Sequence, residues 1–103
     1  WPILAIGGKG VISVTANILP TKVVAMCKAA AKGNIKDAQS IHYELMDIND
    51  TLFIDTNPMP VKAALHLMGK IESEVRAPLV RLSSNNLEKL KKIMISHGLP
   101  IIN

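Results

Sequence analysis

The fold is decided by the stretch Val11-Ile12-Ser13-Val14-Thr15, in which four of five residues are β-branched. Gly10 precedes this run and Ala16-Asn17 follows it, and a short run with such borders is typical of a strand buried on both faces. A buried strand needs hydrogen-bonding neighbours along both edges. No other convincing strand is found among the 103 residues. The pattern therefore predicts that this strand pairs with segments outside the sequence.

The first residues support the same expectation. The sequence begins Trp1-Pro2 and not with Met, and the apolar segment Ile3–Ile6 runs directly into Gly7-Gly8. We therefore expect the sequence to start within a domain and to supply one domain or less.

Two helices are expected directly after the strand. Helical spacing predicts the first over Thr21–Lys32, with Pro20 suited to its start and Gly33 to its end. Asn34 is a candidate cap for the second helix, which carries an apolar stripe over about five turns. The stripe consists of Ile35, Ala38, Ile41, Leu45, Ile48 and Leu52.

Two more helices are expected after the proline-rich break Asn57–Pro60. The third extends from about Pro60 to Met68. The last follows the capping candidates Ser83–Asn86 and ends at Gly98. The sequence thus predicts one strand and four helices.

Composition and charge exclude several classes of protein. Hydrophobic residues make up 49% of the chain, which excludes a disordered protein. The net charge of +4 is spread along the chain and only three residues are aromatic, so we expect no nucleic-acid partner. Cys27 is the only cysteine, which excludes an internal disulfide. No apolar stretch is long enough to span a bilayer, so we expect a cytoplasmic protein without a membrane partner.

The position of the glycine-rich segment Gly7-Gly8-Lys9-Gly10 argues against a nucleotide-binding loop. Phosphate loops follow a strand and open a helix, whereas this segment precedes the strand and completes neither glycine motif. We expect a tight turn that leads the chain back into a sheet.

No residue of the chain is predicted to be catalytic or to bind a metal. His42, His66 and His97 lie far apart, and none has a second ligand three or four residues away. Cys27 lies among alanines and is expected to act as a small hydrophobic residue. Lys62 falls in the first turn of a helix, where a surface charge is the usual role.

Thr15 and Asn17 lie at the end of the predicted strand. In a parallel α/β barrel this is the end at which ligands bind, so the two residues are candidate contacts at an active-site rim. The alternative is that they close a turn or cap the next helix.

Two blocks of sequence carry a resemblance to a known family. They are Gly7–Asn17 and, some forty positions later, Phe53-Ile54-Asp55-Thr56-Asn57-Pro58-Met59-Pro60-Val61-Lys62. In order and spacing they resemble the carboxy-terminal third of the dihydrodipicolinate synthases, also called 4-hydroxy-tetrahydrodipicolinate synthases. The resemblance covers essentially the whole chain, including the ending His97–Pro100.

The resemblance implies an α/β fold of the (β/α)8 TIM-barrel family. Residues 1–33 would form the last β/α unit, with Val11–Thr15 as the eighth strand, and residues 34–103 a carboxy-terminal helical tail. It also implies a class I aldolase-type lyase in lysine and diaminopimelate biosynthesis. The enzyme would condense pyruvate with aspartate semialdehyde through a lysine Schiff base, without a cofactor and as a homotetramer.

Only one functional residue carries over from the family. Ile12 matches the eighth-strand position whose backbone contacts pyruvate. The Schiff-base lysine belongs to an earlier strand, so this chain alone is expected to be inactive, and Lys62 matches a structural lysine of the tail. Two alternatives are a sibling aldolase such as N-acetylneuraminate lyase, and a non-enzymatic helical module that binds a partner helix through the stripe from Ile35 to Leu52.

Overall fold

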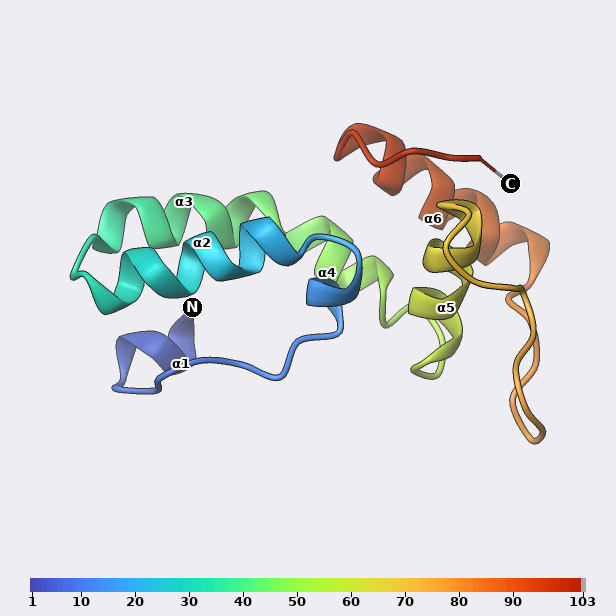
Figure 1. Ribbon diagram of the computed structural model, residues 1–103, viewed down its shortest axis with the longest axis horizontal. Coiled ribbons are helices and arrows are strands. Elements are labelled where there is room, and N and C mark those ends of the chain that lie inside the picture. The colour runs from blue at the N-terminus through green and yellow to red at the C-terminus, as the bar shows by residue number, and fades with distance from the viewer. Residues whose placement is uncertain (103) are drawn as a thin grey trace. The chain divides into compact units, whose positions relative to one another are not determined.

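The computed structural model describes residues 1–102, which form helices joined by loops (Figure 1). Within this range no residue belongs to a strand. The chain divides into two compact units, Trp1–Met46 and Asp47–Asn103.

The first unit is built around a pair of helices. Its elements are α1 (Pro2–Ala5), the 3-10 helix η1 (Thr15–Asn17), α2 (Pro20–Ala31) and α3 (Ile35–Glu44). Helices α2 and α3 pack side by side as an antiparallel hairpin (Figure 1). An ion pair joins the start of α2 to the end of α3, with 2.6 Å between Lys22 Nζ and Glu44 Oε1. The buried residues of this unit are Thr15, Ile18, Val23, Met26, Ala38 and Leu45.

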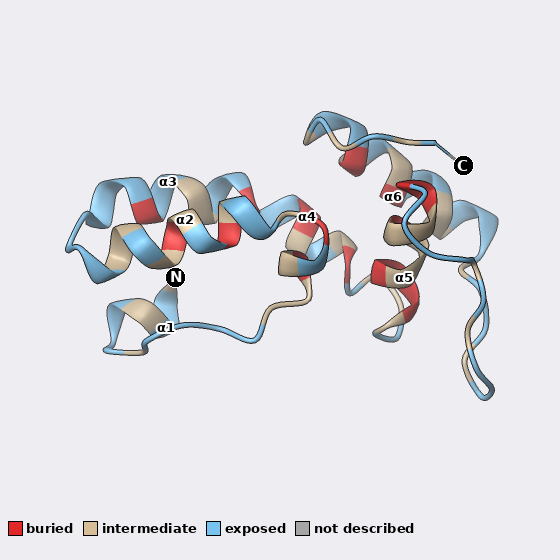
Figure 2. Cartoon of the chain, viewed as in Figure 1, coloured by how far each residue is buried: buried red, intermediate tan, exposed pale blue. Residues whose placement is uncertain are grey.

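The second unit contains three helices and a long connection. Helix α4 (Met46–Thr51) begins at the unit boundary, and α5 (Met59–Leu67) packs against α6 (Ser84–Ser96). The first residues of α5 are buried in succession, whereas α6 buries only one stripe (Figure 2). The least exposed large side chains of this unit are Ile48, Leu52, Pro60, Leu90 and Met94.

Local sequence signals start and stop the helices as expected. The Asn34 side chain accepts a hydrogen bond from the backbone N–H of Asp37 at 3.3 Å, and Ser83 Oγ accepts one from Asn86 at the same distance. At the end of α6, Gly98 adopts a φ of 69°, and the N–H of Leu99 donates to the carbonyl of Met94. This is a Schellman ending, which needs a left-handed residue and therefore favours glycine.

The expectation of a single long helix up to Leu52 is wrong. Helix α3 ends at Glu44, and the capping residue Leu45 has a ψ of −4° and an N–H that donates to the carbonyls of both Ile41 and His42. Helix α4 then starts with its own local bond, in which Asp47 Oδ1 accepts from the N–H of Ile48 at 2.7 Å. The stripe is nevertheless buried at Ala38, Leu45, Ile48 and Leu52, while Ile35 is exposed.

The predicted strand at Val11–Thr15 is also absent from the described residues. Positions 10–13 have no regular secondary structure, and Thr15 already belongs to η1. The physical reason is that a strand is stabilised by hydrogen bonds to its neighbours, and within residues 1–102 no backbone hydrogen bond joins Val11 or Ile12 to another segment.

The capping bond of Asn34 makes a testable contribution to stability. Asn34→Ala leaves the N–H of Asp37 without its side-chain acceptor and should reduce the free energy of unfolding by about 1 kcal/mol. Asn34→Ser is the matched control, since serine also caps helices and should retain most of the stability. Urea unfolding followed by circular dichroism measures both, and equal losses in the two variants would contradict the capping role.

Candidate functional site

The glycine segment after α1 forms a tight turn, as expected. The N–H of Gly7 donates to the carbonyl of Leu4 at 3.1 Å, and that of Gly8 donates to the carbonyl of Ile3 at 2.8 Å. Gly7 has a φ of +104°, and a Cβ on Gly8 would lie 2.6 Å from Cγ2 of Ile3. Both positions therefore require glycine. In the described residues the turn leads to η1 and not into a sheet.

Ile12 lies in the open segment between this turn and η1. Its side chain is fully exposed, and Val11 beside it is also exposed. None of the hydrogen bonds among residues 1–102 uses the backbone of Val11 or Ile12. The backbone N–H and C=O groups of these two residues are therefore exposed and not used within residues 1–102.

Thr15 and Asn17 are close in sequence but have different surroundings. Thr15 is buried, whereas Asn17 is exposed and its Nδ2 donates to the carbonyl of Val14 at 2.9 Å. Ser13 Oγ accepts from the N–H of Ala16 in the same turn. The polar side chain of Asn17 thus closes a turn, which is the structural alternative stated for it above.

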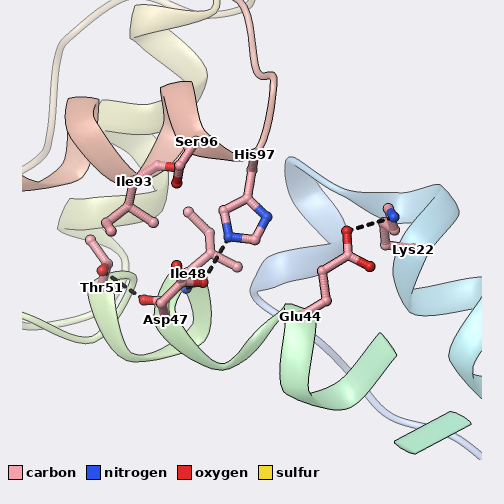
Figure 3. Close-up of polar contacts among 8 residues, drawn as sticks. All are labelled: Lys22, Glu44, Asp47, Ile48, Thr51, Ile93, Ser96 and His97. Atoms are coloured by element: carbon pink, nitrogen blue, oxygen red, sulfur yellow. Dashed lines mark hydrogen bonds and ion pairs between the residues drawn. The ribbon is translucent and has the colours of Figure 1, made fainter. Parts of the chain in front are cut away.

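His97 forms the most notable polar contact of the second unit (Figure 3). Its Nε2 lies 2.7 Å from Oδ1 of Asp47, so the residue after α6 is tied to the first turn of α4. The side chain of His97 is 8% exposed and that of Asp47 54%. A carboxylate can only accept, so Nε2 carries the donated proton. The two residues are fifty positions apart, and no local sequence pattern predicts that they pair.

The folded chain lowers the pKa of Asp47 and of His42. The hydrogen bond from His97 lowers the pKa of Asp47, opposed by partial burial and assisted by the N–H of Ile48. Burial, and then the charge of the N-terminal amine, lowers the pKa of His42. His42 also contacts the ring of Tyr43, with 5.4 Å between the ring centroids.

The remaining candidates line two separate cavities, one in each unit. Cys27 is half-buried and lines a cavity of about 230 Å³ in the first unit, together with Lys9 of the glycine segment. Lys62 and His66 line a cavity of about 300 Å³ in the second unit, where Arg81 and Lys91 join them. The spacing of Lys62 and His66 by four residues signals a shared helix face, but nothing in the sequence links them to Arg81 or Lys91.

The described part of the chain, residues 1–102, holds no cluster suited to a metal ion. In it, no three His, Cys, Asp or Glu side chains gather closely enough to hold one. Within the same range no helix combines the length and hydropathy needed to cross a bilayer.

Comparison with known proteins decides the family. The model of the Dihydrodipicolinate synthetase family matches residues 1–97. The chain belongs to this family. The dihydrodipicolinate synthetase family is a family of enzymes, and its curated members that match the chain are named 4-hydroxy-tetrahydrodipicolinate synthase. The chain spans about a third of the length of these relatives, with 34% and 33% covered in two of them.

Three relatives illustrate how close the similarity is. The 4-hydroxy-tetrahydrodipicolinate synthase of Geobacter sp. (strain M21) is 52% identical over 98 residues, which are 95% of this chain and 34% of that protein. The crystal structure of dihydrodipicolinate synthase from Aquifex aeolicus matches 99% of this chain and 35% of its own, at 43% identity and a TM-score of 0.97. That of the chloride-inhibited Acinetobacter baumannii enzyme, complexed with pyruvate, matches 96% of this chain and 34% of its own, at 34% identity and a TM-score of 0.92. These structures confirm the predicted fold class.

The glycine turn can be tested with a matched pair of substitutions. Gly8→Ala places a Cβ against both the side chain and the carbonyl of Ile3 and should cost about 1–3 kcal/mol of stability. Gly10→Ala is the control, because a Cβ there has no heavy atom within 4 Å. Thermal unfolding of the two variants measures the difference. A Gly8→Ala midpoint as high as that of Gly10→Ala would contradict the close packing of the turn.

The hydrogen bond between Asp47 and His97 should make the free energy of unfolding depend on pH in the acid range. The pKa of Asp47 is lower in the folded state than in the unfolded state. The Asp47 carboxylate therefore stabilises the fold fully above the usual carboxyl pKa of about 4, and this contribution is lost as the pH falls through the lowered pKa. Asp47 is more than half exposed, so Asp47→Asn should cost only about 0.5 kcal/mol at neutral pH and nothing in strong acid.

The control for this variant is Asp50→Asn on the same helix. Asp50 is exposed and carries the same charge, but its side chain forms no hydrogen bond or ion pair with His97. Urea unfolding at several pH values compares the two variants. A loss of stability in Asp47→Asn that stays constant from neutral to acid pH would disprove the contribution of the carboxylate charge.

Proposed function

We propose that this chain is part of a 4-hydroxy-tetrahydrodipicolinate synthase, a lyase that condenses pyruvate with aspartate semialdehyde through a lysine Schiff base. In this proposal residues 1–33 are the last β/α unit of the barrel and residues 34–103 its helical tail. The observation that carries the proposal is the match of the family model over residues 1–97, together with relatives about 50% identical that bear this enzyme's name. The related Acinetobacter baumannii structure is a complex with pyruvate, which supports pyruvate as one substrate.

The lysines of the chain support a Schiff-base lysine elsewhere. The amine must be neutral to attack a carbonyl carbon, and enzymes favour the neutral amine by burial or by a neighbouring cation. None of the ten lysines is buried, and even Lys62 is only half-buried. The chain therefore supplies scaffold and one edge of the substrate site, and it is inactive alone.

Ile12 is the residue proposed to contact pyruvate, through its backbone. Its N–H and C=O are unused by hydrogen bonds within the described chain. A backbone contact also agrees with the exposed apolar side chain, which has no polar group to offer a carboxylate or carbonyl. The open backbone on both sides of Ile12 is what neighbouring barrel strands would pair with.

The rival interpretation as a helix-binding module finds less support. It needs an exposed apolar stripe, but four of the six stripe residues are buried within the chain. The sibling aldolases share the imine chemistry, and the names of the matching relatives favour the synthase over them. A homotetramer and a cytoplasmic location remain part of the proposal.

Trapping with borohydride tests the chemistry directly. Pyruvate and a lysine amine lose water to form an imine, and hydride reduces the imine to a stable secondary amine. The intact protein should gain one reduced pyruvyl group per subunit, while residues 1–103 alone should gain none. Intact mass spectrometry measures the addition, and peptide mapping locates it. Omission of borohydride is the control, since the imine then hydrolyses.

Two outcomes would contradict the proposal. Labelling of Lys62 or another lysine of this chain would place the reactive amine in the wrong segment. An intact protein that forms the imine but does not consume aspartate semialdehyde would instead favour a sibling aldolase.

A further inference from the structure

The second unit contains a cavity that the proposed function does not use. It measures about 300 Å³ and lies between α5, α6 and the segment from residue 73 to residue 82, and we call it the α5–α6 cavity. This volume is at the lower end of the range of small-molecule sites. All of its lining residues belong to Asp47–Asn103.

The charged part of the lining is entirely basic. Lys62, Arg81 and Lys91 contribute cationic side chains from three different segments, and no Asp or Glu is among the lining residues. Among residues 1–102 neither Lys62 nor Arg81 has an ion-pair partner. Lys91 pairs with Glu88 one turn away at 3.0 Å, but Glu88 is 63% exposed, so water screens this pair.

His66 adds an oriented polar group. Its Nδ1 lies 3.1 Å from the carbonyl of Ile71. A carbonyl oxygen can only accept, so this contact fixes the proton on Nδ1 and sets the orientation of the ring. His66 follows Lys62 by four residues on α5, so both side chains are on the face of the helix that lines the cavity.

The rest of the lining is mainly aliphatic. Met59 and Leu67 come from α5, Leu82 from the connecting segment and Leu87 from α6. An inorganic ion would leave this apolar surface in contact with water. An alkyl chain would cover it and gain about 0.8 kcal/mol for each buried methylene, which is roughly a fourfold change in affinity.

We propose that the α5–α6 cavity binds a small organic carboxylate, with its alkyl chain against the aliphatic wall and its carboxylate at Arg81, Lys91 and Lys62. Arginine supports this choice because its planar fork matches a carboxylate with two parallel hydrogen bonds. The proposal does not rest on the Schiff-base chemistry, since none of the cavity residues has a role in it.

The methionine methyl groups provide a direct readout. Met59 lines the cavity, whereas the other four methionines of the chain do not. The intact protein, labelled with ¹³C at the methionine methyl groups, is titrated with butyrate, hexanoate and octanoate. Pyruvate is left out of the titrations, because it is itself a small carboxylate and would compete for the cavity. The readout at Met59 is local and separates this cavity from a pyruvate site elsewhere. The variant Met59→Leu identifies the Met59 resonance and changes the core little.

We expect hexanoate to shift the Met59 resonance saturably and to leave those of the other methionines in place. Affinity should rise roughly fourfold per methylene from butyrate to hexanoate. Hexanol, which lacks the charge, and inorganic phosphate, which lacks the chain, should each bind much more weakly than hexanoate. If hexanol bound as tightly as hexanoate, recognition of the carboxylate would be disproved. If phosphate bound as tightly as hexanoate, the alkyl chain would have no role and the proposal would be disproved as well. Absence of a saturable shift with any carboxylate would overturn the proposal.

Neighbouring lysines on α6 supply a matched pair of variants. Lys91→Gln removes a cation from the cavity lining and should weaken hexanoate binding about tenfold. Lys92→Gln removes the same charge from an exposed position outside the lining and should leave binding unchanged. Arg81→Gln, also at an exposed position, should weaken binding at least as much as Lys91→Gln. Equal effects of Lys91→Gln and Lys92→Gln would show that only net charge matters and would refute the site.

Discussion

A helix satisfies its own backbone hydrogen bonds and a strand does not, and this difference organises the whole chain. The segments with helical spacing form α2, α3, α5 and α6. Val11 and Ile12, which have the composition of a buried strand, keep a backbone without internal hydrogen bonds. The chain therefore combines helices whose backbone hydrogen bonds are internal with one segment whose backbone is open. In the proposed synthase, whose relatives are about three times as long, neighbouring strands pair with this segment.

The helices could be predicted because their signals are local. Asn34 and Ser83 cap the helices that follow them, and Gly98 ends α6 in a conformation that favours glycine. The break at Leu45 could not be predicted, because apolar periodicity continues through it to Leu52. The strand prediction failed for a different reason: β-branched composition describes what a segment prefers once it has partners, not what it does without them.

For the polar sites too, the sequence predicts contacts within one helix but not contacts between segments far apart in the chain. Lys62 and His66 share a helix face through their spacing, which the sequence displays. Arg81 and Lys91 reach the same cavity only through the packing of α5 and α6 and the path of the segment between them. The contact of Asp47 with His97 likewise depends on where α4 and the end of α6 meet. Ile12 differs from these residues, because its proposed contact with pyruvate rests only on the family resemblance.

The hairpin of α2 and α3 also bears on the order in which the chain folds. Its two helices are joined by residues 32–34, and the ion pair of Lys22 with Glu44 at its open end joins positions only 22 residues apart. Closing so short a loop costs little chain entropy, so such a hairpin forms early and quickly. In the proposed synthase, Val11–Thr15 pairs with strands that are distant in sequence, and the same reasoning makes that pairing slower. The hairpin of α2 and α3 does not depend on it and can therefore form first.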